Sequence, residues 1–375
     1  MGEMPFKTHH AWIVAMPVVV AVYLLRFAEI SPTLYISPLV KSAEAPKTLD
    51  TDEYNRRMLA LAHYVAPPIA TTTATNSTSS PQASIPPLLP LATATTSVRL
   101  PGQLWPHPTV YPLPGAILPF KRIVAYYGNF YSKQMGVLGE YEPEVVLAKL
   151  ASTSAMWAAA DPSTPTIPAI HYIAVVAQGT AGRSGLWRLR MPDDQIDKAL
   201  EMARQINGLV FLDVQVGKST LQEELPELTK YLSMPQVHLG VDPEFSMKTG
   251  HAPGTVIGTF DAADINYAAN FLAGLVREHD LPPKILVVHR FTQDMVTNYK
   301  KITPLPEVQI VMDMDGWGSQ AKKKGTYRYV VAPEPVQFTG LKLFYKADLR
   351  PPSVGMLSIE EVLSLMPAPI YIQYQ

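Results

Sequence analysis

The sequence predicts an α/β protein, a (β/α)8 TIM-type barrel preceded by an N-terminal signal-anchor or transmembrane helix and an extended Pro/Thr-rich arm. Three observations lead to this fold class. Eight short runs rich in β-branched and aromatic residues follow residue 121. Amphipathic helical patterns occur between these runs, and that alternation specifies a parallel sheet. The segment 121–375 also has the length of about 250 residues that is typical of such a barrel.

The composition excludes several classes of protein. Of the 375 residues, 47% are hydrophobic and 17% are charged, which is enough apolar material for a large core. The formal net charge of -1 gives no electrostatic reason to expect a nucleic-acid partner. The chain has no cysteine, so disulfides, thiolate nucleophiles, zinc-thiolate sites and a lipoprotein cysteine are all excluded.

Residues 1–31 are predicted to be a signal anchor or transmembrane helix. Residues 11–25 are apolar without a charge, and Arg26 ends the run. This run is shorter than the roughly 20 residues that span a bilayer comfortably, and it also suits a signal-peptide core. No small-x-small cleavage site follows, so an uncleaved anchor is favoured over a removed signal, with a buried core helix as the further alternative. We therefore expect a membrane contact through residues 11–25.

Two segments separate the anchor from the barrel. Residues 32–64 contain a short helical stretch, in which Thr51 or Asp52 can cap the start. Residues 65–120 are rich in proline, threonine and serine, a composition that favours an extended linker over a packed domain. An anchor followed by a spacer predicts that the barrel lies on the extracytoplasmic face, in the periplasm or at the cell surface.

The barrel domain is predicted over residues 121–375. Its eight strands are expected at residues 122–127, 169–178, 208–216, 236–242, 284–291, 308–315, 340–346 and 370–375. Two of the intervening helices are expected at residues 192–206 and 261–280, where apolar residues recur at helical spacing. A doubly wound open sheet is the main alternative, but no G-x-G-x-x-G pattern follows the first run.

The candidate site is read from the ends of these strands, because barrel active sites gather at the carboxyl ends. In "VQIVMDMD", Asp313 and Asp315 alternate with apolar residues and are therefore expected to face the barrel interior. Other strands end in polar groups in the same way. The candidate catalytic residues are Asp213, Asp242, Glu244, Asp313 and Asp315. The candidate substrate-binding residues are Tyr127, Gln215, His289, Trp317, Tyr345 and Gln373.

Carboxylates with nearby aromatic rings suit glycoside hydrolysis. One acid protonates the leaving oxygen, and another attacks the sugar or activates water. The structural alternative is that these acids only end strands or cap the following helices. His238, His251 and His289 lack the spacing of a metal motif, so no metal and no cofactor are expected. The patterns of a phosphate loop and of a serine hydrolase are absent.

Residues 122–375 resemble a group of uncharacterised secreted or lipid-anchored bacterial proteins described as glycosidase-like TIM barrels. The resemblance rests on "LDVQVGKSTLQEELPEL", "KILVVHRFTQDMV", "MDMDGWG" and "GLKLFYKAD", among other stretches. It implies a barrel and an extracytoplasmic location, although this chain lacks the lipobox cysteine of the lipid-anchored members. The acids are also arranged as in α-galactosidase-like enzymes, which implies Asp242 as nucleophile and Asp313 or Asp315 as acid/base.

Two functions from different classes remain open at this point. The first is a membrane-tethered glycoside hydrolase that acts on carbohydrate through its strand-end carboxylates. The second is a non-catalytic structural or binding subunit of a membrane or cell-surface complex, held to membrane-protein partners by the N-terminal helix and arm.

Overall fold

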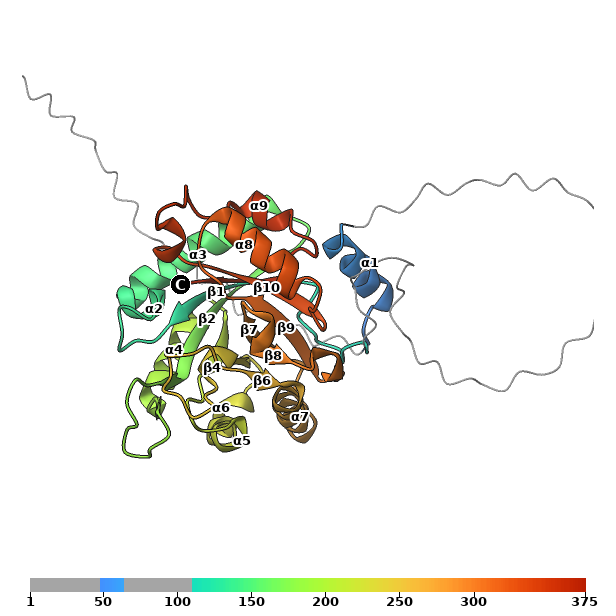
Figure 1. Ribbon diagram of the computed structural model, residues 1–375. Coiled ribbons are helices and arrows are strands. Elements are labelled where there is room, and N and C mark those ends of the chain that lie inside the picture. The colour runs from blue at the N-terminus through green and yellow to red at the C-terminus, as the bar shows by residue number, and fades with distance from the viewer. Residues whose placement is uncertain (1–47, 64–109) are drawn as a thin grey trace, which may run out of the picture. The chain divides into compact units, whose positions relative to one another are not determined.

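The computed structural model describes residues 48–63 and 110–375. Nine strands form one sheet, in which β1 pairs with both β11 and β2 and so closes the sheet into a barrel of eight parallel strands. The ninth strand, β3 (Arg188–Arg190), lies antiparallel on β2. Figure 1 shows the strands in the middle, with α3, α8 and α9 on one side and α4 to α7 on the other. The predicted barrel is therefore confirmed.

The eight predicted runs all become barrel strands. In chain order these are β1 (Arg122–Gly128), β2 (Thr166–Ala177), β4 (Leu209–Val214), β5 (Val237–Val241), β7 (Lys284–Arg290), β9 (Val308–Met314), β10 (Phe338–Leu343) and β11 (Tyr371–Tyr374). Neighbours in the barrel follow this chain order, as expected for successive strands joined by crossover connections. A separate two-stranded sheet joins β6 (Phe260–Asp261) to β8 (Val296–Thr297).

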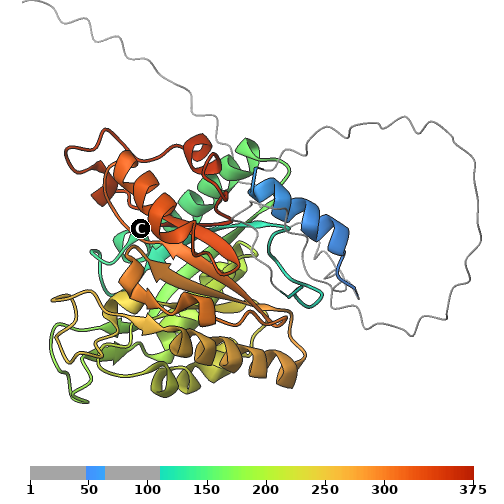
Figure 2. The ribbon, with the colours of Figure 1, turned by 45° about the vertical axis from the view of Figure 1, so that its right-hand side comes forward.

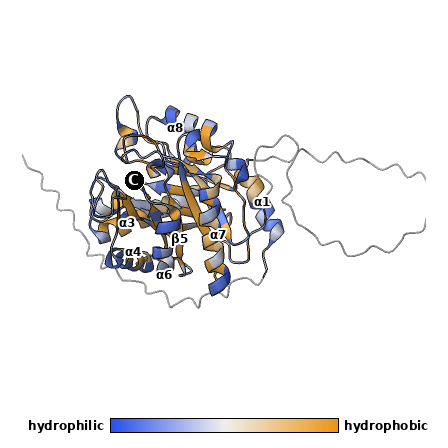
Figure 3. Cartoon of the chain, turned by 60° about the horizontal axis from the view of Figure 1, so that its bottom comes forward, coloured by the Kyte–Doolittle hydropathy of each residue, from blue (hydrophilic) through white to orange (hydrophobic). Residues whose placement is uncertain are grey.

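The strands have two faces of different character. Ile310, Met312 and Met314 of β9 belong to the apolar cluster between the barrel and its helices. Val311, on the alternate face, belongs to a second cluster inside the barrel. This alternation confirms the predicted inward direction of Asp313. Figure 3 shows that the strands carry much of the hydrophobic colour, whereas the helices also show hydrophilic faces.

The helices of the described residues cover the outside of the barrel or its ends. They are α1 (Thr51–Leu61), α2 (Val137–Glu140), α3 (Pro143–Ala160), α4 (Asp193–Gln205), α5 (Leu221–Glu224), α6 (Thr229–Leu232), α7 (Ala262–His279), α8 (Gln320–Thr326) and α9 (Ile359–Leu363). The predicted helices at 192–206 and 261–280 correspond to α4 and α7. A capping box formed by Asp261 and Asp264 begins α7, and Asp280 in the left-handed conformation ends it. In Figure 2, α7 again lies across the barrel from the C-terminal helices.

Helix α1 packs against the amino-terminal end of the barrel. Tyr54 and Met58 are buried with Leu118, which precedes β1, and with Phe338 at the start of β10. The backbone N–H of Ala368 donates to the carbonyl oxygen of Leu61 over 2.7 Å. The helical stretch predicted within 32–64 is therefore present and belongs to the packing of the barrel. The domain boundaries 1–31, 32–64, 65–120 and 121–375 stay a prediction.

The predicted membrane anchor lies in a part of the chain that the structure does not describe. Residues 1–31, including the apolar run 11–25, and most of the predicted linker 65–120 lie outside the described residues. Within residues 48–63 and 110–375, no helix combines the length and the apolar character needed to cross a bilayer.

Candidate functional site

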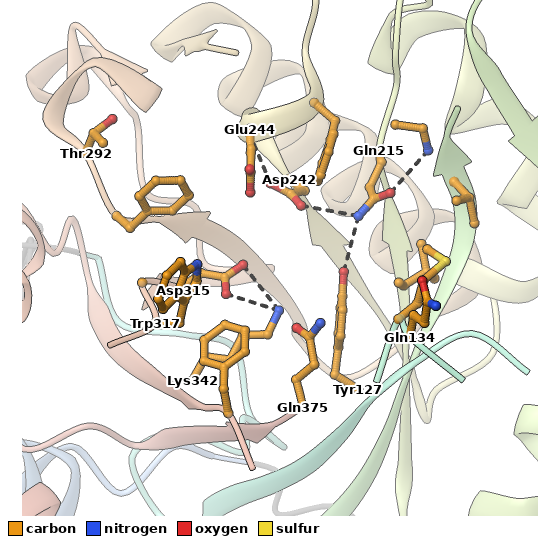
Figure 4. Close-up of a pocket in the computed structure, with 18 of the residues that line it drawn as sticks. Tyr127, Gln134, Gln215, Asp242, Glu244, Thr292, Asp315, Trp317, Lys342 and Gln375 are labelled. Carbon is orange, nitrogen blue, oxygen red and sulfur yellow. Dashed lines mark hydrogen bonds and ion pairs between the residues drawn. The ribbon is translucent and has the colours of Figure 1, made fainter. Parts of the chain in front are cut away.

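A cavity of about 700 Å³ opens at the carboxyl ends of the barrel strands. Its walls combine acids, amides and a lysine with several aromatic rings. Among the lining residues are Tyr127, Gln215, Asp242, Glu244, Phe245, Phe291, Asp315, Trp317, Lys342 and Phe344. This is the end of the barrel at which the sequence predicted a site. Figure 4 shows Asp242 and Glu244 on one side of the cavity and Asp315 with Lys342 on another.

An ion pair between Asp315 and Lys342 forms one wall. The Nζ atom of Lys342 lies 3.1 Å from Oδ1 and 3.3 Å from Oδ2 of Asp315. It also lies 3.7 Å from the ring centroid of Tyr127, within cation–π distance. Both charged side chains are buried. Burial opposes the charge of Asp315, but Lys342 and His289 outweigh it and hold the pKa of that carboxyl below its usual value.

Asp242 and Glu244 form the opposite wall. Oδ1 of Asp242 accepts from the backbone N–H of Glu244 over 3.0 Å, which caps a short 3-10 helix over Pro243–Phe245. The amide of Gln215 donates to the other oxygen of Asp242 over 3.4 Å. Burial, with nearby carboxylates, raises the pKa of Asp242 well above its usual value. Burial and the charge of Asp315 raise the pKa of Glu244 to about 7.

Beneath the cavity, a network of buried polar groups fills the barrel interior. The hydroxyl of Tyr127 donates to Oδ2 of Asp213 over 2.9 Å. Oδ1 of Asp213 lies 3.4 Å from Nε2 of His171 and 3.4 Å from Nε2 of His289. Burial opposes the charge of His289. Asp213, Asp313 and Asp315 outweigh burial and raise the pKa of His289 well above its usual value. His289 and His171 likewise hold the pKa of Asp213 low against the effect of burial.

The other ring nitrogens of the two histidines also lie near oxygen atoms. Nδ1 of His289 lies 3.3 Å from Oδ2 of Asp313 and 3.3 Å from Oδ2 of Asp315. Nδ1 of His171 lies 2.5 Å from the hydroxyl of Tyr371. Among the described residues, His171, Asp213 and His289 are the group whose ligand-type atoms lie close enough together to hold a metal ion. These atoms all lie within 4.8 Å of one another.

The predicted site residues fall into three groups. Those that line the cavity are Tyr127, Gln215, Asp242, Glu244, Asp315 and Trp317. Those that are buried and do not line it are Asp213, His289, Asp313 and Gln373. Tyr345 does not line the cavity either. Its ring stacks on Tyr374, which belongs to the cluster on the outer face of the barrel, because Tyr345 continues the outward alternation of Leu341 and Leu343.

Lys342 and His171 are two of the site residues that were not predicted, as are Phe245, Phe291 and Phe344 of the cavity wall. Lys342 lines the cavity. The sequence feature that could have predicted this is its position between Leu341 and Leu343, which places it on the inward face of β10. His171 lies in the network below, and its signal was a single histidine within an otherwise apolar strand.

Comparison with models of known protein families and with curated protein sequences finds no match to this chain.

Proposed function

We propose that the cavity is the active site of a glycoside hydrolase, with Glu244 as the proton donor and Asp315 as the second carboxylate. The observation that carries this proposal is that these two acids line one cavity in opposite electrostatic surroundings. Asp315 is paired with Lys342, which favours its ionised form. Burial and the nearby Asp315 favour the protonated form of Glu244. One protonated and one ionised carboxyl are what cleavage of a glycosidic bond requires.

The proposed roles differ from those that the resemblance implied. Asp242 was the expected nucleophile, but it already accepts hydrogen bonds from the backbone of Glu244 and from Gln215. Its raised pKa also makes it a poor nucleophile. Asp313 is fully buried and does not line the cavity. We therefore assign Asp242 and Asp313 to positioning. Asp315 either attacks the anomeric carbon or, as general base, takes a proton from the water molecule that attacks it.

The aromatic walls support a sugar as the ligand. Trp317 is 48% exposed at the cavity, while Phe245 and Phe291 also line it. Flat rings pack against the apolar C–H faces of sugars, and the amides of Gln215 and Gln134 offer hydrogen bonds to hydroxyl groups. In this proposal the barrel acts outside the cytoplasm, tethered to the membrane through residues 11–25.

Hydrolysis of aryl glycosides with different leaving groups tests the proposal. Glu244→Gln should lose about 10²- to 10⁴-fold in kcat/KM on glycosides with poor leaving groups and much less on those with good ones, because only the former need a proton. Asp315→Asn should lose activity on both kinds. Glu278→Gln, on the exposed surface of α7, is the matched control.

Three results would contradict this assignment. Equal activity of wild type and Glu244→Gln on poor leaving groups would remove Glu244 as the acid. Full activity of Asp315→Asn would remove the second carboxylate. Binding of a glycan by the wild type without any hydrolysis would favour the non-catalytic binding subunit.

A further inference from the structure

The histidines and the aspartate beneath the cavity point to a second function for the barrel interior. We propose that His171, Asp213 and His289 bind one divalent transition-metal ion of the zinc type. This inference does not depend on the glycosidase proposal, since none of these three residues lines the cavity.

The spacing of the three ligand-type atoms fits a metal. Nε2 of His171 and Nε2 of His289 each lie 3.4 Å from Oδ1 of Asp213. Ligands in a tetrahedral site with bonds of about 2.0–2.1 Å are separated by about 3.4 Å. Two of the three separations match this value, and all three atoms lie within 4.8 Å of one another. Two imidazole nitrogens and one carboxylate oxygen are a donor set suited to zinc and related first-row ions.

These atoms also lack better partners. His171, Asp213 and His289 are 0% exposed. Among the described residues, Nε2 of both histidines and Oδ1 of Asp213 make no hydrogen bond of acceptable geometry, although they face one another at 3.4 Å. Buried polar atoms in proteins nearly always have partners, so three such atoms within 4.8 Å of one another support a ligand there.

The surroundings of the histidines match those of metal ligands. A metal-binding histidine usually donates its second N–H to an oxygen atom, which fixes the ring. Nδ1 of His289 faces Asp313 and Asp315 at 3.3 Å, and Nδ1 of His171 faces the hydroxyl of Tyr371 at 2.5 Å. The ring of His171 is therefore held with Nε2 turned toward Asp213, whereas Nδ1 of His289 faces the two carboxylates without a hydrogen bond of acceptable geometry.

Gly240 leaves room for the cluster. A Cβ atom at this position of β5 would lie 2.4 Å from Nε2 of His171 and 2.5 Å from Oδ1 of Asp213. The absence of a side chain on the adjacent strand is thus what allows these two groups to meet.

The test uses the full chain, purified without a histidine tag, stripped with a chelator and titrated with Zn²⁺ or Co²⁺. We expect one ion per chain by elemental analysis, the visible absorption bands of tetrahedral cobalt, and a Tm that rises with the free metal concentration. His171→Gln should lose the stoichiometric ion. Tyr371→Phe, which removes only the hydroxyl beside Nδ1, should weaken binding about 10- to 100-fold. His251→Gln, which removes an exposed histidine, is the control and should bind as wild type.

The proposal is overturned if the wild type binds neither metal stoichiometrically, or if His171→Gln binds as tightly as the wild type. A wild type that stays metal-free and well folded would mean that a protonated His289 between the aspartates completes the network instead. Should His171→Gln fail to fold, the wild-type cobalt spectrum and the Tyr371→Phe affinity decide the question.

Discussion

Glu244 gives the sharpest prediction, because its effect on stability can be measured without knowing the substrate. Replacing Glu244 with Gln keeps the size of the side chain and removes its ionisation. In the folded protein, burial and the charge of Asp315 raise the pKa of this carboxyl from 4.5 to about 7. The folded state therefore holds the proton over a pH range in which the unfolded chain releases it.

The sign and size of the effect follow from linkage. Between pH 4.5 and about 7 the folded state binds one more proton than the unfolded state, so the free energy of unfolding falls as the pH rises. Each pH unit corresponds to about 1.4 kcal/mol, which over this interval gives on the order of 3 kcal/mol from Glu244. This contribution is fully present below pH 4.5 and is lost as the pH passes 7. Glu244→Gln should therefore gain stability over wild type as the pH is raised to 8.

Urea unfolding of both proteins at pH 5, 6, 7 and 8 measures this gain. The quantity that matters is the difference in the free energy of unfolding between variant and wild type at each pH, since the titration of groups that do not interact with Glu244 cancels in it. The exposed Glu278→Gln is the control for the loss of a carboxylate in solvent. A Glu244→Gln difference that is the same at all four pH values would refute the raised pKa and, with it, the role of Glu244 as acid.

Three other predictions concern the rest of the chain. Lys342→Met should lower the free energy of unfolding by about 3 kcal/mol in the urea assay, because the buried Asp315 loses its partner. Lys346→Met removes an exposed lysine and should lower it by less than about 1 kcal/mol. Met58→Ala should cost about 2–4 kcal/mol by leaving a cavity between α1 and the barrel, and a change below about 0.5 kcal/mol in thermal unfolding would mean that α1 does not pack there. Deleting residues 1–31 should move the chain from the membrane to the soluble fraction, and continued sedimentation with membranes would contradict the anchor.

The barrel could be predicted from the sequence because its strands carry their geometry in their pattern. In β9, Ile310, Met312 and Met314 recur at every second position, and this spacing indicated that their face of the strand packs against the helices. The carboxyl ends of parallel strands then had to meet at one end of the barrel. That reasoning brought Asp242, Glu244 and Asp315 to one cavity.

The depth of each residue could not be predicted in the same way. Asp313 and Asp315 face the same side, yet Asp315 reaches the cavity and Asp313 is buried beneath it. Alternation gives the direction of a side chain but not its height in the barrel, which depends on strand tilt and stagger. The pairing of His171 with Asp213 also depends on the empty space at Gly240, a three-dimensional fact with no local signal.

The position of α1 has a consequence for how the barrel is presented. The first described element, α1, packs on the amino-terminal end of the barrel. Near the same end, the backbone N–H of Leu113 donates to the carbonyl oxygen of Pro306, which precedes β9. The cavity opens at the other end. Whatever precedes α1 in the chain is therefore joined to the barrel at its base and not at its mouth.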